Sequence, residues 1–342
     1  MDKLYILAGI SAVLSFLFTP LVKKAAVKFR VLDIPKDKRK IHKKPIPLLG
    51  GLAIYASFVL TLIFKTGALS SQEKGIVIGA TIIVIGGIID DKYDMRPRYK
   101  LIFQILAAIV LILYGVNITF ITNPMLNSNQ YLFIGWLSAP LTILWVIGIT
   151  NALNLIDGLD GLAAGVALIS SVTIFIIAII NSRADAAVLT AILSGAILGF
   201  LPYNFNPASI FMGDTGAQLL GFLLAAISME GTIKSAAAFA IAVPILALGI
   251  PIYDTLFAVI RRKVNGRPIM QADRGHLHHR LIDMGLTQRQ TVVIMYLISA
   301  ILGSFAIIAM QISNQRAYMM LTLVMLCLVF IAWKCGFFQH RG

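Results

Sequence analysis

The sequence alternates between long apolar runs and short polar gaps along its 342 residues. A transmembrane helix needs about 20 mostly apolar residues, and eleven runs approach or exceed that length. The predicted spans are residues 4–22, 48–64, 75–89, 99–116, 131–150, 162–180, 186–201, 217–233, 235–260, 291–310 and 317–333. The polar gaps are too short for an independent core. We therefore expect an all-α, polytopic integral membrane protein, with residues 1–342 forming one transmembrane domain.

Composition supports this fold class. Hydrophobic residues make up 58% of the chain and charged residues 13%, whereas soluble domains carry roughly 25% charged residues. A soluble enzyme is excluded, and two cysteines are too few for a disulfide scaffold. The net charge of +14 does not indicate nucleic acid, because the basic residues lie in the gaps between apolar runs.

The basic residues also predict the orientation of the chain in the membrane. If the eleven spans alternate, 23 Lys and Arg residues fall on one side and six on the other. The side rich in Lys and Arg faces the cytoplasm in most membrane proteins. We expect an N-terminus outside, a cytoplasmic C-terminus and, in bacteria, a location in the cytoplasmic (inner) membrane.

Eleven of the fifteen acidic residues fall on the predicted cytoplasmic side. The gaps 151–161 and 202–216 contain Asp157, Asp160 and Asp214 but no Lys or Arg, so the usual salt-bridge partners are missing from these gaps. Carboxylates without basic partners at a membrane boundary indicate a bound cation. The candidate chemistry therefore lies on one face of the membrane.

The first of these gaps has a three-residue polar period, formed by Asn151, Asn154, Asp157 and Asp160. On a helix this spacing places the side chains along one slowly rotating face, which suits a divalent ion or a polar nucleotide. The alternative is a solvated helix end, which would normally include Lys.

Three acidic residues have structural as well as functional interpretations. Asp90 and Asp91 close the third run, where adjacent carboxylates repel unless a cation or proton intervenes; a surface feature is the alternative. Asp214 lies between Gly213 and Gly216 before an apolar run. It is either a helix N-cap or a Mg²⁺ ligand beside a helix N-terminus that faces phosphate.

Basic residues gather in two gaps on the same side. His276, His278 and His279 lie among arginines that include Arg280; this set suits a diphosphate better than Zn²⁺, because no Cys or acidic residue is spaced to complete a tetrahedral site. The gap 23–47 holds ten basic residues, which the topology signal and attraction to anionic lipid largely explain. Within it, we place three residues at the site: His42, Lys43 and Lys44.

The segments GGIIDDKYDMRP, NALNLIDGLDGLAAG, FMGDTGAQLLGF and ADRGHLHHRLIDMGLT follow one another in this order. On these segments, over roughly residues 1–310, the chain resembles the polyprenyl-phosphate N-acetylhexosamine-1-phosphate transferases. The related phospho-N-acetylmuramoyl-pentapeptide transferases carry three consecutive histidines, and here Leu277 interrupts the run. The chain is thus more similar to the branch that starts teichoic acid, O-antigen or related surface glycans from UDP-GlcNAc.

The resemblance implies a magnesium-dependent enzyme, with Mn²⁺ as an alternative metal. It would transfer GlcNAc-1-phosphate from UDP-GlcNAc to undecaprenyl phosphate and release UMP at the cytoplasmic face. Its implied partners are these two substrates and membrane lipids, with a second copy of the chain as the candidate protein partner. The implied roles are catalysis for Asp90, Asp91 and Asp214, metal binding for Asp214 and Asp91, nucleotide-sugar binding for Asn151, Asn154, Asp157, Asp160 and Phe211, diphosphate binding for His276, His278, His279 and Arg280, and lipid-phosphate binding for His42, Lys43 and Lys44.

Two other classes remain open from the residues alone. A secondary transporter would also be multi-span, but its site would lie near the bilayer midplane; Asp254, beside Pro251 in the ninth run, is the residue that favours it. A non-catalytic membrane scaffold leaves the acidic gaps without basic residues unexplained.

Overall fold

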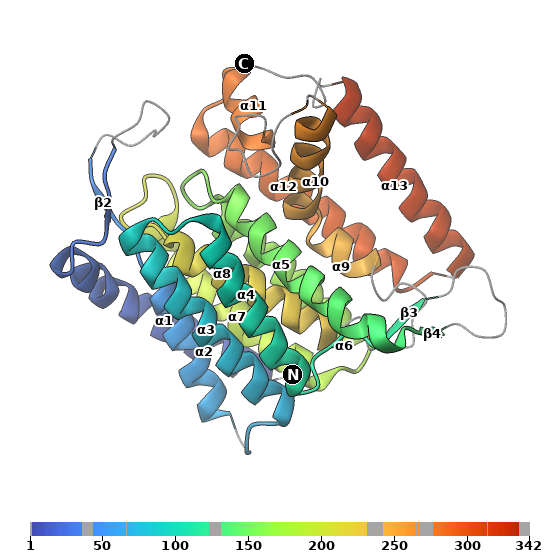
Figure 1. Ribbon diagram of the computed structural model, residues 1–342, viewed down its shortest axis with the longest axis horizontal. Coiled ribbons are helices and arrows are strands. Elements are labelled where there is room, and N and C mark those ends of the chain that lie inside the picture. Colours follow the sequence, from blue (N-terminus) through green and yellow to red (C-terminus); the bar gives the residue numbers. More distant parts are fainter. Residues whose placement is uncertain are drawn as a thin grey trace.

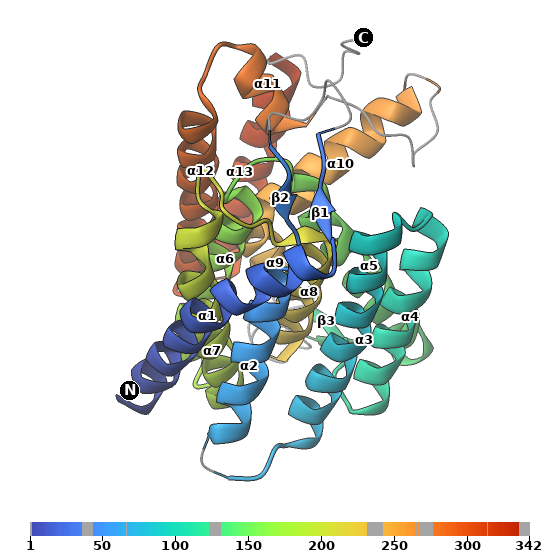
Figure 2. The same ribbon diagram turned by 90° about the vertical axis from the view of Figure 1, so that its left-hand side faces the viewer.

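In the computed structural model the chain is a bundle of helices (Figures 1 and 2). The structure describes residues 2–35, 44–65, 67–122, 131–230, 242–264, 266, 276–312 and 314–334. The elements in these ranges are α1 Asp2–Lys28, β1 Leu32–Asp33, β2 Ile46–Pro47, α2 Gly51–Phe64, α3 Ser71–Tyr93, α4 Pro97–Leu113, β3 Phe120–Thr122, β4 Tyr131–Phe133, a 3-10 turn Gly135–Leu137, α5 Ser138–Ile156, α6 Leu162–Ile180, α7 Ala184–Asn204, α8 Gly213–Ser228, α9 Ala242–Ala247, α10 Gly249–Val264, α11 Leu277–Asp283, α12 Gln288–Ala309 and α13 Asn314–Lys334.

Six of the helices described are long and apolar enough to cross a membrane. They are α1, α3, α5 with its preceding turn, α6, α7 and α12, and α2 and part of α13 are shorter apolar helices. The polytopic, helical fold class is thus confirmed.

The apolar runs predict most helix positions within a few residues. The run 131–150 differs, because its first residues form β4, which pairs with β3 as an antiparallel hairpin before α5 begins. The run 235–260 also differs: within its described part, α9 and α10 are separated at Leu248.

The most buried helix of the bundle is α8, whose residues from Thr215 to Ser228 are all buried. It packs against α3 and α5, while α1 lies along α7. Close approach depends on glycine: a Cβ added to Gly221 would lie 2.6 Å from Thr150 Cα, on α5. Because α8 has neighbours on several sides, its first turn lies inside the protein, and this turn carries Asp214.

Polar connections gather at one end of the bundle. Figure 2 places β1, β2, α11 and the end of α10 there, with the α2–α3 connection at the opposite end. At the opposite end, the buried Glu73 pairs with Lys65 and completes a capping box with Ser70 at the start of α3.

Candidate active site

Asp91, near the end of α3, binds the N-terminus of α8. Its Oδ1 accepts a hydrogen bond of 2.7 Å from the Asp214 amide, and its Oδ2 accepts bonds of 3.1 Å and 2.6 Å from the amide and hydroxyl of Thr215. A carboxylate at this position is favoured by the partial positive charge of a helix N-terminus. Glycine permits the approach, since Gly213 has φ +69° and an added Cβ would lie 2.5 Å from Asp91 Oδ2.

The N-cap alternative for Asp214 is therefore wrong. Met212 occupies the N-cap position of α8, and Asp214 lies within the first turn. The side chain that satisfies the first amides comes from Asp91, a residue 123 positions earlier in the chain. The Asp214 carboxylate is thus available for other contacts.

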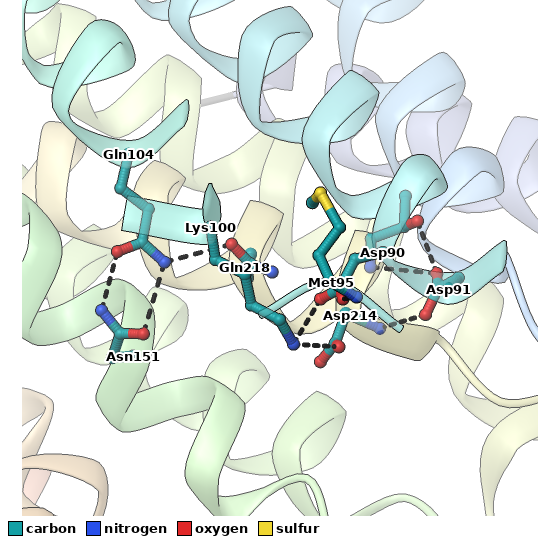
Figure 3. A network of polar contacts seen from close by, with 9 residues as sticks. Asp90, Asp91, Met95, Lys100, Gln104, Asn151, Asp214 and Gln218 are labelled. Carbon is teal, nitrogen blue, oxygen red and sulfur yellow. Dashed lines mark hydrogen bonds and ion pairs between the residues drawn. The ribbon is translucent and has the colours of Figure 1, made fainter. Parts of the chain in front are cut away.

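Lys100, on the first turns of α4, lies between two of the carboxylates (Figure 3). Its Nζ is 2.5 Å from Asp90 Oδ2 and 2.9 Å from Asp214 Oδ2. The other oxygen of Asp90 accepts a hydrogen bond of 2.9 Å from the Met95 amide. The expectation that Asp214 lacks a basic partner is therefore wrong, because Lys100 reaches it from α4.

A cluster of three amide side chains, of which Gln104 and Gln218 are buried, lies beside this group in Figure 3 and joins α4, α5 and α8. Gln104 Nε2 donates to Gln218 Oε1 at 3.1 Å, and Asn151 Nδ2 donates to Gln104 Oε1 at 2.7 Å and to the Ile147 carbonyl at 2.8 Å. Gln104 is one turn from Lys100, and Gln218 one turn from Asp214. The structure thus places Asn151 in an internal network that holds the three helices together.

The spacing predicts that the Asn and Asp residues of the 151–160 segment share one helix face, but in the structure they do not. Helix α5 ends at Ile156, so Asp157 and Asp160 lie in the turn before α6. Asn154 lies beside the Asp214 carboxylate. Burial, together with the charges of Asp214, Asp91 and Asp160, raises the pKa of Asp157 to about 8. Because several negative groups converge here, the turn favours a cation.

Asp160 points to a different neighbour. Its Oδ2 accepts hydrogen bonds of 3.0 Å from Asn206 Nδ2 and 2.9 Å from the Ala208 amide, and Asn206 also donates to Gln288 Oε1 at 2.8 Å. Asp160 thus ties the α7–α8 connection to the start of α6.

Phe211, in the α7–α8 connection, is half-buried. Its backbone amide donates a hydrogen bond of 2.8 Å to the Pro47 carbonyl, and its carbonyl accepts one of 3.0 Å from the Gly50 amide. These contacts fix the connection against β2 and the start of α2.

The histidines lie at the start of α11. His276 is the N-cap residue, His278 is 1% exposed, and their rings are parallel within 9° at 5.9 Å between centroids. The His279 ring centroid is 4.2 Å from that of His278. Arg280 is 1% exposed, so this end of α11 is packed inside the protein.

His278 connects the histidines to the acidic turn. A Cβ added to Gly158 would lie 2.6 Å from His278 Nε2, and neither ring nitrogen has a hydrogen-bond partner among the described residues. Burial and the neighbouring His279 lower the pKa of His278 to about 3, so this ring is neutral at physiological pH. Two of the predicted groups, the 157–161 turn and the histidines, thus meet at one place.

The basic residues predicted from the gap 23–47 are only partly placed. Lys44 is exposed just before β2. His42 and Lys43 lie outside the described residues.

An apolar cavity of about 350 Å³ lies against α5 and α10. Ile118, Leu144, Trp145, Gly148, Ile252 and Leu256 are among the residues that line it. Ala152, also in its wall, is next to Asn151 of the amide cluster. The cavity thus extends along α5, the helix that also carries Asn151.

The carboxylates suit a hard cation. In the described part of the chain no three Asp, Glu, His or Cys side chains form a ready metal cluster. Mg²⁺ does not require one, because it is usually held by one or two carboxylates together with waters and substrate phosphates. Asp90 and Asp214 supply carboxylate oxygens that share a cationic neighbour, so this donor set fits Mg²⁺.

Comparison with known proteins agrees with this chemistry. Residues 74–232 match the family model Glycosyl transferase family 4. A probable undecaprenyl-phosphate N-acetylglucosaminyl 1-phosphate transferase of Bacillus subtilis is 40% identical, over 94% of this chain and 88% of that protein. A decaprenyl-phosphate N-acetylglucosaminephosphotransferase of Mycolicibacterium smegmatis is 34% identical, over 84% of this chain and 77% of that protein. An undecaprenyl-phosphate alpha-N-acetylglucosaminyl 1-phosphate transferase of Escherichia coli is 28% identical, over 95% and 92%.

These matches extend over most of the chain, and the matched region contains the carboxylates, Lys100 and the acidic turn. The chain therefore belongs to the family of polyprenyl-phosphate N-acetylhexosamine-1-phosphate transferases.

Proposed function

We propose that this protein transfers GlcNAc-1-phosphate from UDP-GlcNAc to undecaprenyl phosphate, giving undecaprenyl-diphosphate-GlcNAc and UMP, as the first step of a cell-surface glycan. The observation that carries the proposal is the cluster of Asp90, Asp214 and Lys100 at one end of the bundle. The cluster lies beside an amide network that includes Asn151 of α5, and α5 also lines an apolar cavity. A phosphate and a prenyl chain could thus bind in neighbouring places, and the relatives' names supply the two substrates.

In the proposed reaction, a phosphate oxygen of the lipid attacks the β-phosphorus of UDP-GlcNAc in line. The new P–O bond forms as the bond between the β-phosphorus and the bridging oxygen breaks, and UMP leaves with that oxygen. Phosphoryl transfer depends mainly on positioning and charge neutralisation. A phosphate monoester has a second pKa near 6, so the attacking group is ionised at neutral pH without a general base.

The residues then have distinct proposed roles. Asp90 and Asp214 would hold Mg²⁺, which supplies charge neutralisation at the diphosphate. Asp91, to which the resemblance gives a metal role, has both oxygens bonded to Asp214 and Thr215, so we propose instead that it keeps the first turn of α8, and with it Asp214, in place. Lys100 balances the carboxylates and is a cationic contact for a phosphate. His276, His279 and Arg280 are proposed to bind the diphosphate.

The test is release of UMP by purified protein given undecaprenyl phosphate and Mg²⁺. A panel of UDP-sugars should give UMP with UDP-GlcNAc and much less with UDP-glucose. Omission of either the lipid phosphate or the metal is the matched control. Equal UMP release without lipid phosphate would contradict transfer and indicate a hydrolase.

We also propose eleven spans with the N-terminus outside and the site at the cytoplasmic face. The proposal rests on the 23 to six distribution of Lys and Arg. Reporter fusions after residues 40, 95, 275 and 340 should report the cytoplasm, and fusions near 70, 125 and 183 the outside. A cytoplasmic signal at 125 would contradict the eleven-span arrangement.

Asp157 gives metal binding a predicted pH dependence. Its pKa of about 8 means that it is protonated at neutral pH in the metal-free protein. A cation binds the ionised form better, so the metal concentration for half-maximal activity should fall by up to about tenfold per pH unit from pH 6.5 to pH 8. Asp157→Asn should flatten this dependence. If the metal requirement of Asp157→Asn varied as steeply with pH as that of the wild type, the group that loses a proton on metal binding would not be Asp157.

A further inference from the structure

Asp254 is a buried carboxylate on α10 to which the proposed reaction gives no role. It is 5% exposed, and both of its oxygens have partners at the start of α11. Oδ2 is 2.8 Å from His276 Nδ1, and Oδ1 accepts a 2.8 Å hydrogen bond from the Leu277 amide. One carboxylate thus holds both the side chain of the N-cap residue and the first amide of α11.

From this geometry we infer that Asp254 is a positioning residue, which acts through His276 to present the His276–His279 array to the diphosphate. The inference rests on the proposed function. An ionised carboxylate only accepts hydrogen bonds, so His276 Nδ1 carries the hydrogen. The ring orientation is thereby fixed, and Nε2 is the nitrogen left for a ligand, where a second ring hydrogen would be donated to a diphosphate oxygen.

The array extends outward from this anchor. The His276 ring is parallel to that of His278, and His278 in turn contacts His279 and Gly158. A change in the position of His276 is therefore transmitted to the rings that follow. Because α11 has only seven residues, it has little stability of its own, and an anchor outside the helix is needed to hold it.

This role also accounts for an acidic residue in an apolar run. An intramembrane carboxylate could indicate a transported ion. Here its two oxygens are both occupied by groups of the chain itself, which favours the positioning role over the transporter interpretation.

The variant Asp254→Asn tests the hydrogen bond to the His276 ring while leaving the packing around residue 254 nearly unchanged. The Asn oxygen can still accept from the Leu277 amide, but its NH₂ group then faces His276 Nδ1, so this nitrogen must accept and the ring can no longer carry hydrogens on both nitrogens. We expect kcat/KM for UDP-GlcNAc to fall by about ten- to a hundredfold. The KM for undecaprenyl phosphate should change by less than about threefold, since the array is assigned to the diphosphate. Asp283→Asn, a change of the same charge at an exposed position of α11, is the matched control.

A double-mutant cycle tests whether Asp254 acts through His276. In a His276→Ala background, Asp254→Asn should lower kcat/KM by less than about threefold further, because the ring that it orients is gone. Wild-type activity of Asp254→Asn would overturn the inference. So would losses that simply multiply in the double variant.

Hydrogen–deuterium exchange of the full-length protein gives a readout that does not require activity. Asp254→Leu removes both contacts, so the amides of Leu277–Asp283 should exchange faster while α8 stays protected. Faster exchange throughout the bundle would mean that Asp254 is merely structural, and unchanged exchange in α11 would also overturn the inference. If the wild-type protein released no UMP, the proposed function would fail, and this exchange measurement alone would decide the role of Asp254.

Discussion

Asp214→Asn is expected to lower kcat by about a hundredfold or more, equivalent to ~2.7 kcal/mol of lost transition-state stabilisation. The change removes a charge from the proposed metal site and from the ion pair with Lys100. Raising Mg²⁺ should restore part of the activity, because the remaining ligands still bind the ion weakly. UMP release measured over a range of Mg²⁺ concentrations checks both expectations.

The variant should remain folded, because Asp91 and not Asp214 holds the N-terminus of α8. The backbone amide of residue 214 still donates to Asp91 Oδ1 after the change. Asp94→Asn is the matched control: Asp94 is an exposed residue in the left-handed region at the end of α3, a conformation that Asn tolerates. Full activity of Asp214→Asn at ordinary Mg²⁺ would contradict the metal role, and loss of thermal stability would give Asp214 a structural one.

The sequence predicts the helices well because membrane helices have a strong local signal. A run of apolar residues defines each helix whatever its neighbours are, so the run 162–180 predicts α6 to the residue. The same local reasoning fails where the chain turns. The period of Asn151, Asn154, Asp157 and Asp160 is consistent with one helix, but Gly158 and Gly161 allow the turn that ends α5, and Gly161 has φ +77°.

The site residues that the sequence leaves out are those whose partners lie far along the chain. Lys100 bonds Asp214 from 114 residues away, and the Gln104–Gln218 contact has the same separation. A signal does exist: Gln104 and Gln218 are uncharged polar residues inside apolar runs, each four residues after a charged one. Within a helix this spacing places both side chains on one face. What the sequence lacks is the information that α4 and α8 face each other.

The relative importance of His276, His278 and His279 for activity also cannot be predicted from the sequence alone. A regular helix would put His276 and His279 on one face and turn His278 away. His276 instead precedes α11, with ψ 151°, and its ring lies parallel to that of His278. The helical-face argument therefore fails for His276, and the expected order of importance must rest on charge and contacts.

We expect His279→Ala to have the largest effect, because the His279 ring is the one of the three that is partly exposed to a ligand; kcat/KM should fall by one to three orders of magnitude, or about 1.4 kcal/mol per tenfold. His276→Ala should come next, since it removes the ring that Asp254 orients. His278→Ala should cost least, because a ring with a pKa of about 3 stays neutral and cannot offer the diphosphate a positive charge. Kinetics of the three variants decide the order, with His278→Asn as a control that keeps a polar side chain against Gly158. The order is wrong if His278→Ala is the most impaired of the three, and the diphosphate role is wrong if all three keep wild-type rates.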